Sequence, residues 1–262
     1  MESYLKCEEC AGNVIDKEAG ILNRGNLARL KNFLSRAAQG ERLTVGFIGG
    51  SITQGFAATE PDQCYAARTV AWLRKVFPNT EFDYVNAGIG ATNSQFGAAR
   101  VQEDLLRRLP DRVMVEFSVN DHCTPHDMET YEGLIRQIYG SRSCPAMVLL
   151  HSVYYDTGKS AAYYHAQIGR HYDLPCISMQ NSIYPAVAAG RLPAEKITAD
   201  FLHPNDLGHE FMASVITNFL EKVIHDKTQE PQEIFPAPLT ENAYEHCVRL
   251  QYFNSTPEKS GF

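Results

Sequence analysis

Asp200 and His203 are spaced as a carboxylate and a histidine that can work as a pair. With the carboxylate three residues before the ring, Asp200 can bond one ring nitrogen and leave the other free to accept a proton. Such a histidine needs a nucleophile, and Ser51 is a candidate because it follows an apolar run and two glycines. A second apolar run, between these motifs, ends in the side-chain amide of Asn120. These four residue types in this order predict acyl-transfer chemistry.

The chemistry assigns a role to each of the three reactive residues. A serine hydroxyl is a weak nucleophile at its own pKa, so Ser51 needs His203 to remove its proton. Asp200 would fix the tautomer of the ring and stabilise the imidazolium, and the same ring would protonate the leaving alcohol. Negative charge on the carbonyl oxygen of an ester requires preorganised donors, each worth about 3 to 4 kcal/mol. The sequence therefore predicts Ser51, Asp200 and His203 as a catalytic triad.

Each of these residues also has a purely structural interpretation. Ser51 could cap the helix that follows its strand, and Asn120 could belong to a turn. Asp200 and His203 could form a surface pair. Asp121 fits an organiser of its loop better than a reacting group. The nearby histidines 122, 126 and 209 are expected to be structural or to face substrate.

Short apolar runs alternate with helical patterns over most of the chain. The runs predict strands at residues 44–48, 82–85, 113–117, 146–150 and 175–179, and the patterns between them predict helices at residues 23–39, 65–76, 94–109, 128–140, 160–171 and 206–225. Strands that are apolar on both faces indicate a parallel sheet covered by helices on both sides. We therefore expect an α/β fold, a flavodoxin-like three-layer αβα sandwich with a central parallel sheet of about five strands.

Four motifs together resemble the four sequence blocks of the SGNH (GDSL-type) hydrolases. The motifs are Gly49-Gly50-Ser51, residues 86–90, residues 118–121 and residues 200–204. The resemblance extends over residues 43–220 and implies the SGNH hydrolase fold and a serine esterase. The first block has Gly-Gly-Ser where Gly-Asp-Ser is familiar, and the third has Ser-Val-Asn-Asp where Gly-x-Asn-Asp is usual. Neither departure removes the nucleophile or the amide.

The resemblance also implies an oxyanion hole with three donors. They are the backbone N–H of Ser51, a backbone N–H in the second block and the side-chain amide of Asn120. Gly88, Gly90 and Ala91 all fit the second block by slightly different alignments, and we select Gly90. The Ser51 motif is not Gly-x-Ser-x-Gly, which counts against the other large class of α/β hydrolases.

The predicted loops indicate a small acyl group on a polar alcohol. They carry polar and aromatic residues and no long apolar stretch for a fatty chain; these residues are Gln54, Phe56, Thr59, Gln63, His122, His126, Tyr154 and Tyr155. The motif variants also resemble SGNH enzymes that deacetylate plant polysaccharides or oligosaccharides. The expected function is a carbohydrate O-acetyl esterase acting through an acyl-Ser51 intermediate. The alternatives are a lipolytic esterase or lysophospholipase of the same fold, and a non-catalytic carbohydrate-binding protein.

Composition limits the partners. The chain has 262 residues, a formal charge of −7 and no basic block, which argues against nucleic acid. No apolar run reaches the roughly 18 residues of a membrane span, and no signal segment is recognisable at the start, so the expected location is cytoplasmic. Cys7 and Cys10 have metal-like spacing without a second pair, so we expect neither metal nor cofactor. The sequence leaves formation of a homo-oligomer open.

The character of the chain changes after residue 225. Residues 226–238 are polar and hold three prolines, and residues 240–253 return to an amphipathic pattern. We therefore divide the chain into a catalytic domain at residues 1–225 and a C-terminal linker and extension at residues 226–262. The extension is too short for a core of its own. Three arrangements are open for it: docking on the main domain, pairing with another subunit, or beginning an accessory β-domain. We favour docking.

Overall fold

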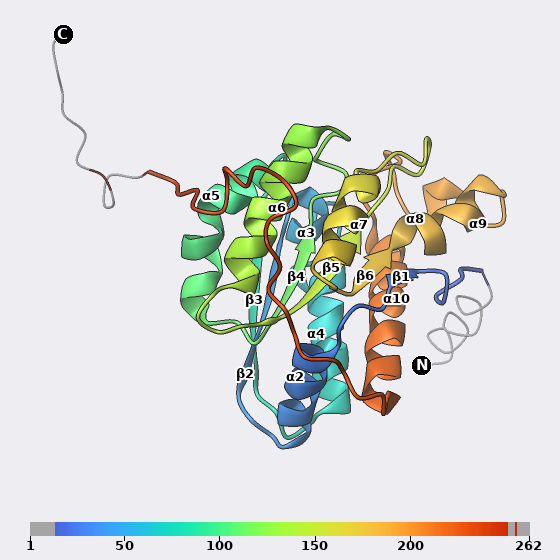
Figure 1. The fold of residues 1–262 in the computed structure, drawn as a ribbon. Coiled ribbons are helices and arrows are strands. Elements are labelled where there is room, and N and C mark those ends of the chain that lie inside the picture. The colour runs from blue at the N-terminus through green and yellow to red at the C-terminus, as the bar shows by residue number, and fades with distance from the viewer. Residues whose placement is uncertain (1–13, 251–254, 256–262) are drawn as a thin grey trace, which may run out of the picture.

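A six-stranded sheet lies between two layers of helices in the computed structural model, which describes residues 14–250 and 255 (Figure 1). The strands are β1 (Ile21–Asn23), β2 (Leu43–Gly49), β3 (Phe82–Gly88), β4 (Arg112–Glu116), β5 (Ala146–His151) and β6 (Cys176–Ser178). Their order in the sheet is β1-β6-β5-β4-β2-β3. Strands β2 to β6 are parallel, and β1 pairs antiparallel with β6.

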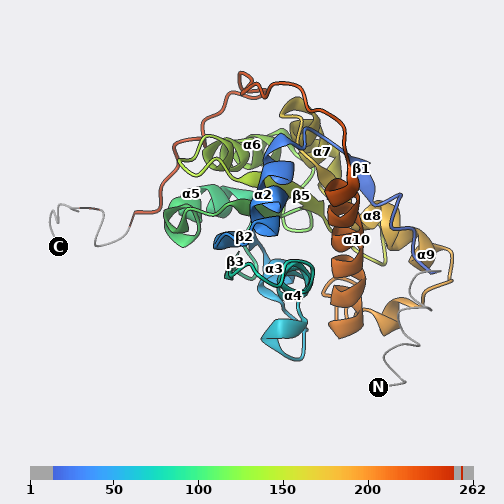
Figure 2. The same ribbon diagram turned by 90° about the horizontal axis from the view of Figure 1, so that it is seen from below.

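Three long helices cover each face of the sheet (Figure 2). One face carries α2 (Ala28–Ala38), α4 (Tyr65–Val76) and α10 (Asp206–His225), and the other carries α5 (Ser94–Asp104), α6 (Pro125–Tyr139) and α7 (Ala162–His171). Neighbouring residues of a strand enter different cores: Phe47 packs on the first face and Ile48 on the second. Because both faces are buried, the strands are apolar at consecutive positions. The three-layer α/β prediction is confirmed.

The chain start differs from its prediction. The segment expected to begin a helix at residue 23 instead forms the edge strand β1, and α2 begins at Ala28. Gly25 takes a left-handed φ of 61°, and the side chain of Asn26 accepts a hydrogen bond from the N–H of Ala28 at 2.9 Å. This turn separates strand from helix. By contrast, the bounds of α4 and α10 agree with the sequence-based prediction.

Short elements occupy the loops around the sheet. They are α3 (Ser51–Gln54), α8 (Met179–Ser182), α9 (Tyr184–Ala188) and the 3₁₀ helices at Pro61–Gln63, Leu106–Arg108 and Ala194–Lys196. The predicted helix at residues 94–109 therefore ends at Asp104 and continues as a separate 3₁₀ turn. Helix α3 lies directly after β2 and carries Ser51 at its first position.

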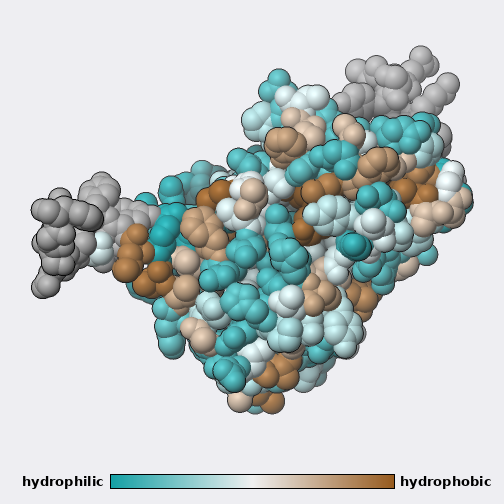
Figure 3. All heavy atoms as spheres, turned by 90° about the horizontal axis from the view of Figure 1, so that it is seen from above, coloured by the Kyte–Doolittle hydropathy of each residue, from teal (hydrophilic) through white to brown (hydrophobic). Residues whose placement is uncertain are grey.

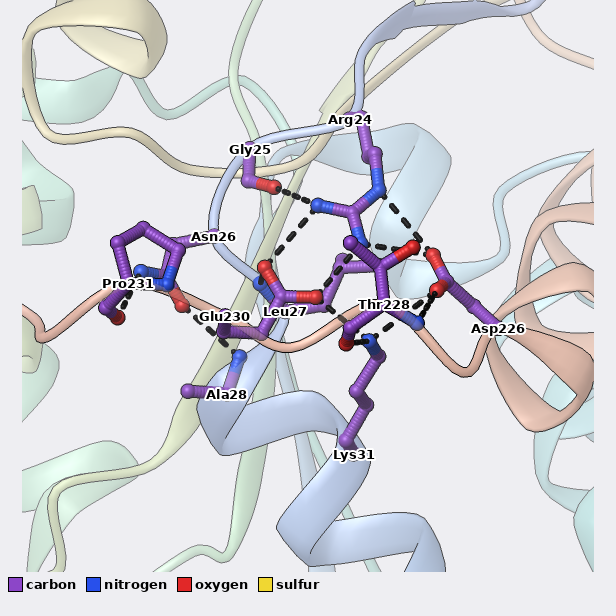
Figure 4. Close-up of polar contacts among 10 residues, drawn as sticks. All are labelled: Arg24, Gly25, Asn26, Leu27, Ala28, Lys31, Asp226, Thr228, Glu230 and Pro231. Carbon is purple, nitrogen blue, oxygen red and sulfur yellow. Dashed lines mark hydrogen bonds and ion pairs between the residues drawn. The ribbon is translucent and has the colours of Figure 1, made fainter.

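The segment at residues 226–250, which we call the strap, crosses the helices of the main domain (Figure 1). Its first part is fixed to α2 and to the turn before that helix by ion pairs (Figure 4). Glu230 bonds Arg24 at 2.6 Å, Lys31 at 2.6 Å and the backbone N–H of Leu27 at 3.2 Å, and Asp226 bonds Arg24 at 2.7 Å. The hydrogen bond from Arg24 is the main cause that lowers the pKa of Glu230 to about 2.

The second part of the strap lies on α6 and α7. Phe235 stacks on Tyr139 with ring centroids 4.8 Å apart, and the guanidinium of Arg136 lies 4.3 Å from the Phe235 ring. Glu132 accepts the backbone N–H groups of Leu239 at 2.6 Å and Thr240 at 2.7 Å. The described part of the extension thus contacts the main domain along its course. The division at residue 225 stays a prediction.

No helix among the described residues is long and apolar enough to cross a membrane. In the same part of the chain, no group of three or more His, Cys, Asp or Glu side chains is arranged to hold a metal ion. The predicted pair Cys7 and Cys10 lies outside the described residues.

Candidate active site

The candidate site lies at the carboxyl ends of β2 and β4. Strand β2 pairs with β3 on one side and with β4 on the other, so the chain changes direction across the sheet at this point. Ligands of open α/β sheets bind at such a switch point. Ser51 follows β2 and Asn120 follows β4. A side chain at Gly50 would collide with the Asn120 side chain, so glycine there lets the two loops touch.

The structure brings the three predicted triad residues together. The Oγ of Ser51 lies 2.9 Å from Nε2 of His203, and Nδ1 of His203 lies 2.6 Å from Oδ2 of Asp200. The ring therefore bridges the hydroxyl and the carboxylate through its two nitrogens. This arrangement can move a proton from the hydroxyl to the ring and hold the resulting imidazolium beside a negative charge.

The loop that carries Asp200 and His203 is closed by its own backbone. Thr198 and Pro204 form an isolated antiparallel bridge, and Oδ1 of Asp200 accepts the N–H groups of Leu202 at 3.0 Å and His203 at 2.8 Å. Partial burial opposes ionisation, but hydrogen bonds from the His203 side chain and from these N–H groups outweigh it and hold the pKa of Asp200 well below its ordinary value. The Asp200 carboxylate therefore stays charged while it orients the His203 ring.

Other histidines named from the sequence do not join the triad. His209 is fully buried on α10, accepts the N–H of Tyr65 at 3.3 Å, and has a pKa lowered to about 4 by burial. It therefore stays neutral and packs against the Tyr65 ring. His126 contacts Gln95 on the surface at 3.2 Å.

Asn120 approaches the nucleophile loop through its amide. Its Oδ1 is buried against Gly50 and makes no hydrogen bond within residues 14–250. The opposite end of the amide, Nδ2, is then available to a substrate oxygen. The N–H of Ser51 is at the first position of α3, where no acceptor exists within the helix. Two of the three expected oxyanion donors therefore lie on adjoining loops.

The third expected donor is already engaged. The N–H of Gly90 donates to Oε1 of Gln54 at 2.9 Å, while the N–H of Gly88 donates to Oδ1 of Asn86 at 2.9 Å. A Cβ at Gly90 would lie 3.8 Å from that of Ser51, so this glycine borders the nucleophile. Ala91, the remaining alternative, has a left-handed φ of 58°. The hydrogen bond between Gly90 and Gln54 was not predicted, because nothing in the sequence distinguishes Gln54 from the other loop glutamines.

A buried polar layer supports the two loops from below. Oε1 of Glu116 accepts the N–H of Ser118 at 3.1 Å and its Oγ at 3.0 Å, and burial raises the pKa of this carboxyl to about 7. Asp121 accepts the N–H of Ser94 at 2.8 Å and bonds Nε2 of His165 at 2.9 Å. Asp121 therefore organises its loop, as expected from the sequence.

A pocket of about 700 Å³ opens beside Asn120. Most of its lining residues have polar side chains, among them His122, Tyr154, Asp156, Lys159 and Gln180. Viewed from the side on which the strands end, the surface mixes hydrophilic residues with small separate hydrophobic groups (Figure 3). Tyr155, named from the sequence among the polar and aromatic loop residues, is buried in the core.

The chain resembles known proteins in sequence and in fold. The family model described as "GDSL-like Lipase/Acylhydrolase family" matches residues 47–211. A crystal structure of a two-domain esterase active on acetylated mannans, co-crystallised with mannopentaose, is 53% identical with a TM-score of 0.87. The similarity covers 90% of this chain and 63% of that one. A second structure of such an esterase is 52% identical with a TM-score of 0.88, over 91% of this chain and 65% of that one.

A more distant similarity concerns the fold alone. An acetyl xylan esterase from Geobacillus stearothermophilus is 20% identical with a TM-score of 0.57, over 68% of this chain and 94% of that one. A search of curated proteins found no match. The chain spans less than two thirds of the two-domain esterase that it resembles. The family model covers more than half of the chain, and Ser51, Asp200 and His203 all lie within it. The chain belongs to the GDSL-like lipase/acylhydrolase family, which is the SGNH group predicted from its sequence.

Proposed function

We propose that the protein is a carbohydrate O-acetyl esterase that removes acetyl groups from mannan-type saccharides. The observation that carries the proposal is the hydroxyl–imidazole–carboxylate relay, with 2.9 Å between Ser51 and His203 and 2.6 Å between His203 and Asp200. The mannan specificity is supported by the 52–53% identity to an esterase active on acetylated mannans.

The reaction follows from the relay in two steps. The Oγ of Ser51 attacks the acetyl carbonyl carbon while Nε2 of His203 takes the hydroxyl proton. The carbonyl oxygen becomes negative and is met by the N–H of Ser51, by Nδ2 of Asn120 and, once Gln54 has moved, by the N–H of Gly90. The sugar oxygen then leaves with the proton from His203. Water attacks the acetyl-Ser51 ester with His203 again as base, which releases acetate and restores the hydroxyl.

The polar side chains that line the pocket beside Asn120 favour a hydrophilic alcohol over a long acyl chain. A lipase needs extended apolar surface for its substrate, whereas this pocket offers hydroxyl, amide, carboxylate and ammonium groups. Neither metal nor cofactor enters the proposed steps, and a cytoplasmic location stays a prediction.

Acetate release from acetylated mannan oligosaccharides tests the proposal. Ser51→Ala removes the nucleophile and is expected to lower kcat by about 10³-fold or more, with no loss of thermal stability. Ser214→Ala, on α10 and away from the crevice, is the matched control and should leave kcat unchanged. Faster turnover of octanoyl than acetyl esters would favour the lipolytic alternative. Absence of hydrolysis in the unmodified protein, with saccharide binding retained, would favour the binding-protein alternative.

A further inference from the structure

Phe201 lies between the two triad residues of its loop and is 49% exposed. Its φ of +62° is in the left-handed region, which a bulky side chain rarely adopts. The cause is the turn itself: Asp200 accepts the N–H groups of the two residues that follow Phe201, and this requires a sharp reversal between them. Glycine would meet that requirement with least strain. Neither backbone preference nor burial accounts for a phenylalanine here.

The backbone of Phe201 is nevertheless held firmly. Its carbonyl accepts the N–H of Tyr155 at 2.7 Å. Tyr155 is buried, and its neighbour Tyr154 lines the pocket beside Asn120. The exposed ring therefore projects from a fixed point that connects the triad loop to a wall of this pocket. A ring in such a position can present a surface to a ligand at little cost in ordering.

A second exposed aromatic ring packs on the histidine of the triad. Phe56 is 56% exposed, and its ring centroid is 4.5 Å from that of His203. Phe56 lies in the turn that ends the short helix carrying Ser51. Its N–H donates to the Ser51 carbonyl at 3.0 Å. The two loops that supply the nucleophile and the base thus each carry one exposed phenylalanine.

These observations point to an occupant that is apolar on one face and polar at its rim. A pyranose ring has this character, because its axial C–H groups form an apolar face and its hydroxyls lie around the edge. Aromatic rings bind such faces, while polar groups of the adjoining pocket can receive the hydroxyls. An acyl chain would use the rings but leave the polar pocket walls without partners.

We propose that Phe201, together with Phe56, forms an aromatic platform that binds the sugar ring carrying the acetyl group. The platform determines specificity for the alcohol part of the ester and takes no part in bond breaking. The inference rests on the proposed esterase function and adds the residues that recognise the sugar.

Phe201→Gly separates the effect of the ring from the effect of the turn, because glycine removes the ring and keeps the left-handed backbone. On acetylated mannan oligosaccharides, we expect KM to rise roughly five- to tenfold with little change in kcat. On methyl acetate, which has no ring to bind, kcat/KM should stay within about twofold. The melting temperature should not fall, since the backbone is relieved. Phe201→Trp should restore the saccharide KM.

Leu109→Gly is the matched control. Leu109 is also 49% exposed with a left-handed φ of 50°, but it precedes β4 at the opposite edge of the sheet. The Leu109→Gly variant should be relieved of the same backbone strain, with no change in KM or kcat on either ester. An equal loss on both esters after Phe201→Gly would overturn the inference, because the residue would then act through the Asp200–His203 turn. An unchanged saccharide KM would overturn it as well.

A binding measurement keeps the inference separate from the esterase function. Calorimetry of the Ser51→Ala protein with mannopentaose should give a Kd about five- to tenfold weaker when Phe201→Gly is added. This result does not depend on turnover, so it holds even if the unmodified protein releases no acetate. Equal affinity with and without the ring, or no mannopentaose binding by either protein, would contradict the platform.

Discussion

At the scale of single residues, Gln54 already bonds one donor of the predicted oxyanion hole. Its Oε1 accepts the N–H of Gly90 at 2.9 Å, which is the donor expected to meet the substrate. A carbonyl oxygen that develops negative charge must compete with this glutamine, and a neutral hydrogen bond contributes about 0.5–1.5 kcal/mol. In the free site, Oε1 of Gln54 therefore bonds the N–H group that the substrate oxygen is expected to use.

We therefore expect Gln54→Ala to raise kcat/KM for methyl acetate roughly two- to tenfold. The reason is that the N–H of Gly90 no longer has a partner to give up. Steady-state acetate release measures the effect, and Gln39→Ala, at the end of α2, is the control with no expected change. A fall in kcat/KM would instead show that the Gln54 side chain contributes to the reaction.

At the scale of elements, the strap is held by a close approach to α6. A Cβ at Gly133, within α6, would come within 2.6 Å of the backbone and Cβ of Tyr244 in the strap. In an exposed helix, alanine in place of glycine stabilises by about 0.5–1 kcal/mol. Here the contact with the strap reverses the sign.

Gly133→Ala is accordingly expected to destabilise the protein by about 1–3 kcal/mol, because the strap or the helix must shift. Denaturant unfolding measures the change, and limited proteolysis should show faster cleavage within residues 226–250. Gly140→Ala, at the end of the same helix, is the control, since its nearest neighbour would be at 3.4 Å. Stabilisation by Gly133→Ala would mean that the strap does not rest on the helix as described.

At the scale of the whole molecule, Glu116 couples stability to pH. It is fully buried at the end of β4, and burial raises its pKa from 4.5 to about 7. Between these two values the folded state keeps a proton that the unfolded chain has released. The contribution of this carboxyl is therefore favourable at low pH and declines as pH rises from about 4.5 to 7.

Glu116→Gln removes this dependence because the amide stays neutral and keeps an oxygen for Ser118. We expect the variant to be more stable than the unmodified protein above pH 7, by on the order of 3 kcal/mol, with the difference vanishing near pH 4.5. Denaturant unfolding at several pH values measures it. Glu41→Gln, on the surface, is the control. A constant difference across this range would show that the carboxyl does not titrate in it.

Local patterns in the sequence were sufficient for the layered α/β fold, for the bounds of helices α4 and α10, and for naming Ser51, Asp200 and His203. Hydrophobic periodicity and motif spacing carry that information because strands, helices and the Asp-x-x-His turn form between near neighbours in the chain. The edge strand β1 could not be recognised in this way. It has only three residues, and its partner Ile177 is more than 150 positions away.

Only the tertiary structure decided which groups meet across loops. Three contacts join segments far apart in sequence: the hydrogen bond from Gly90 to Gln54, the packing of Phe56 on His203, and the docking of the strap. Such contacts depend on the placement of whole elements, and residue type alone does not encode that placement locally.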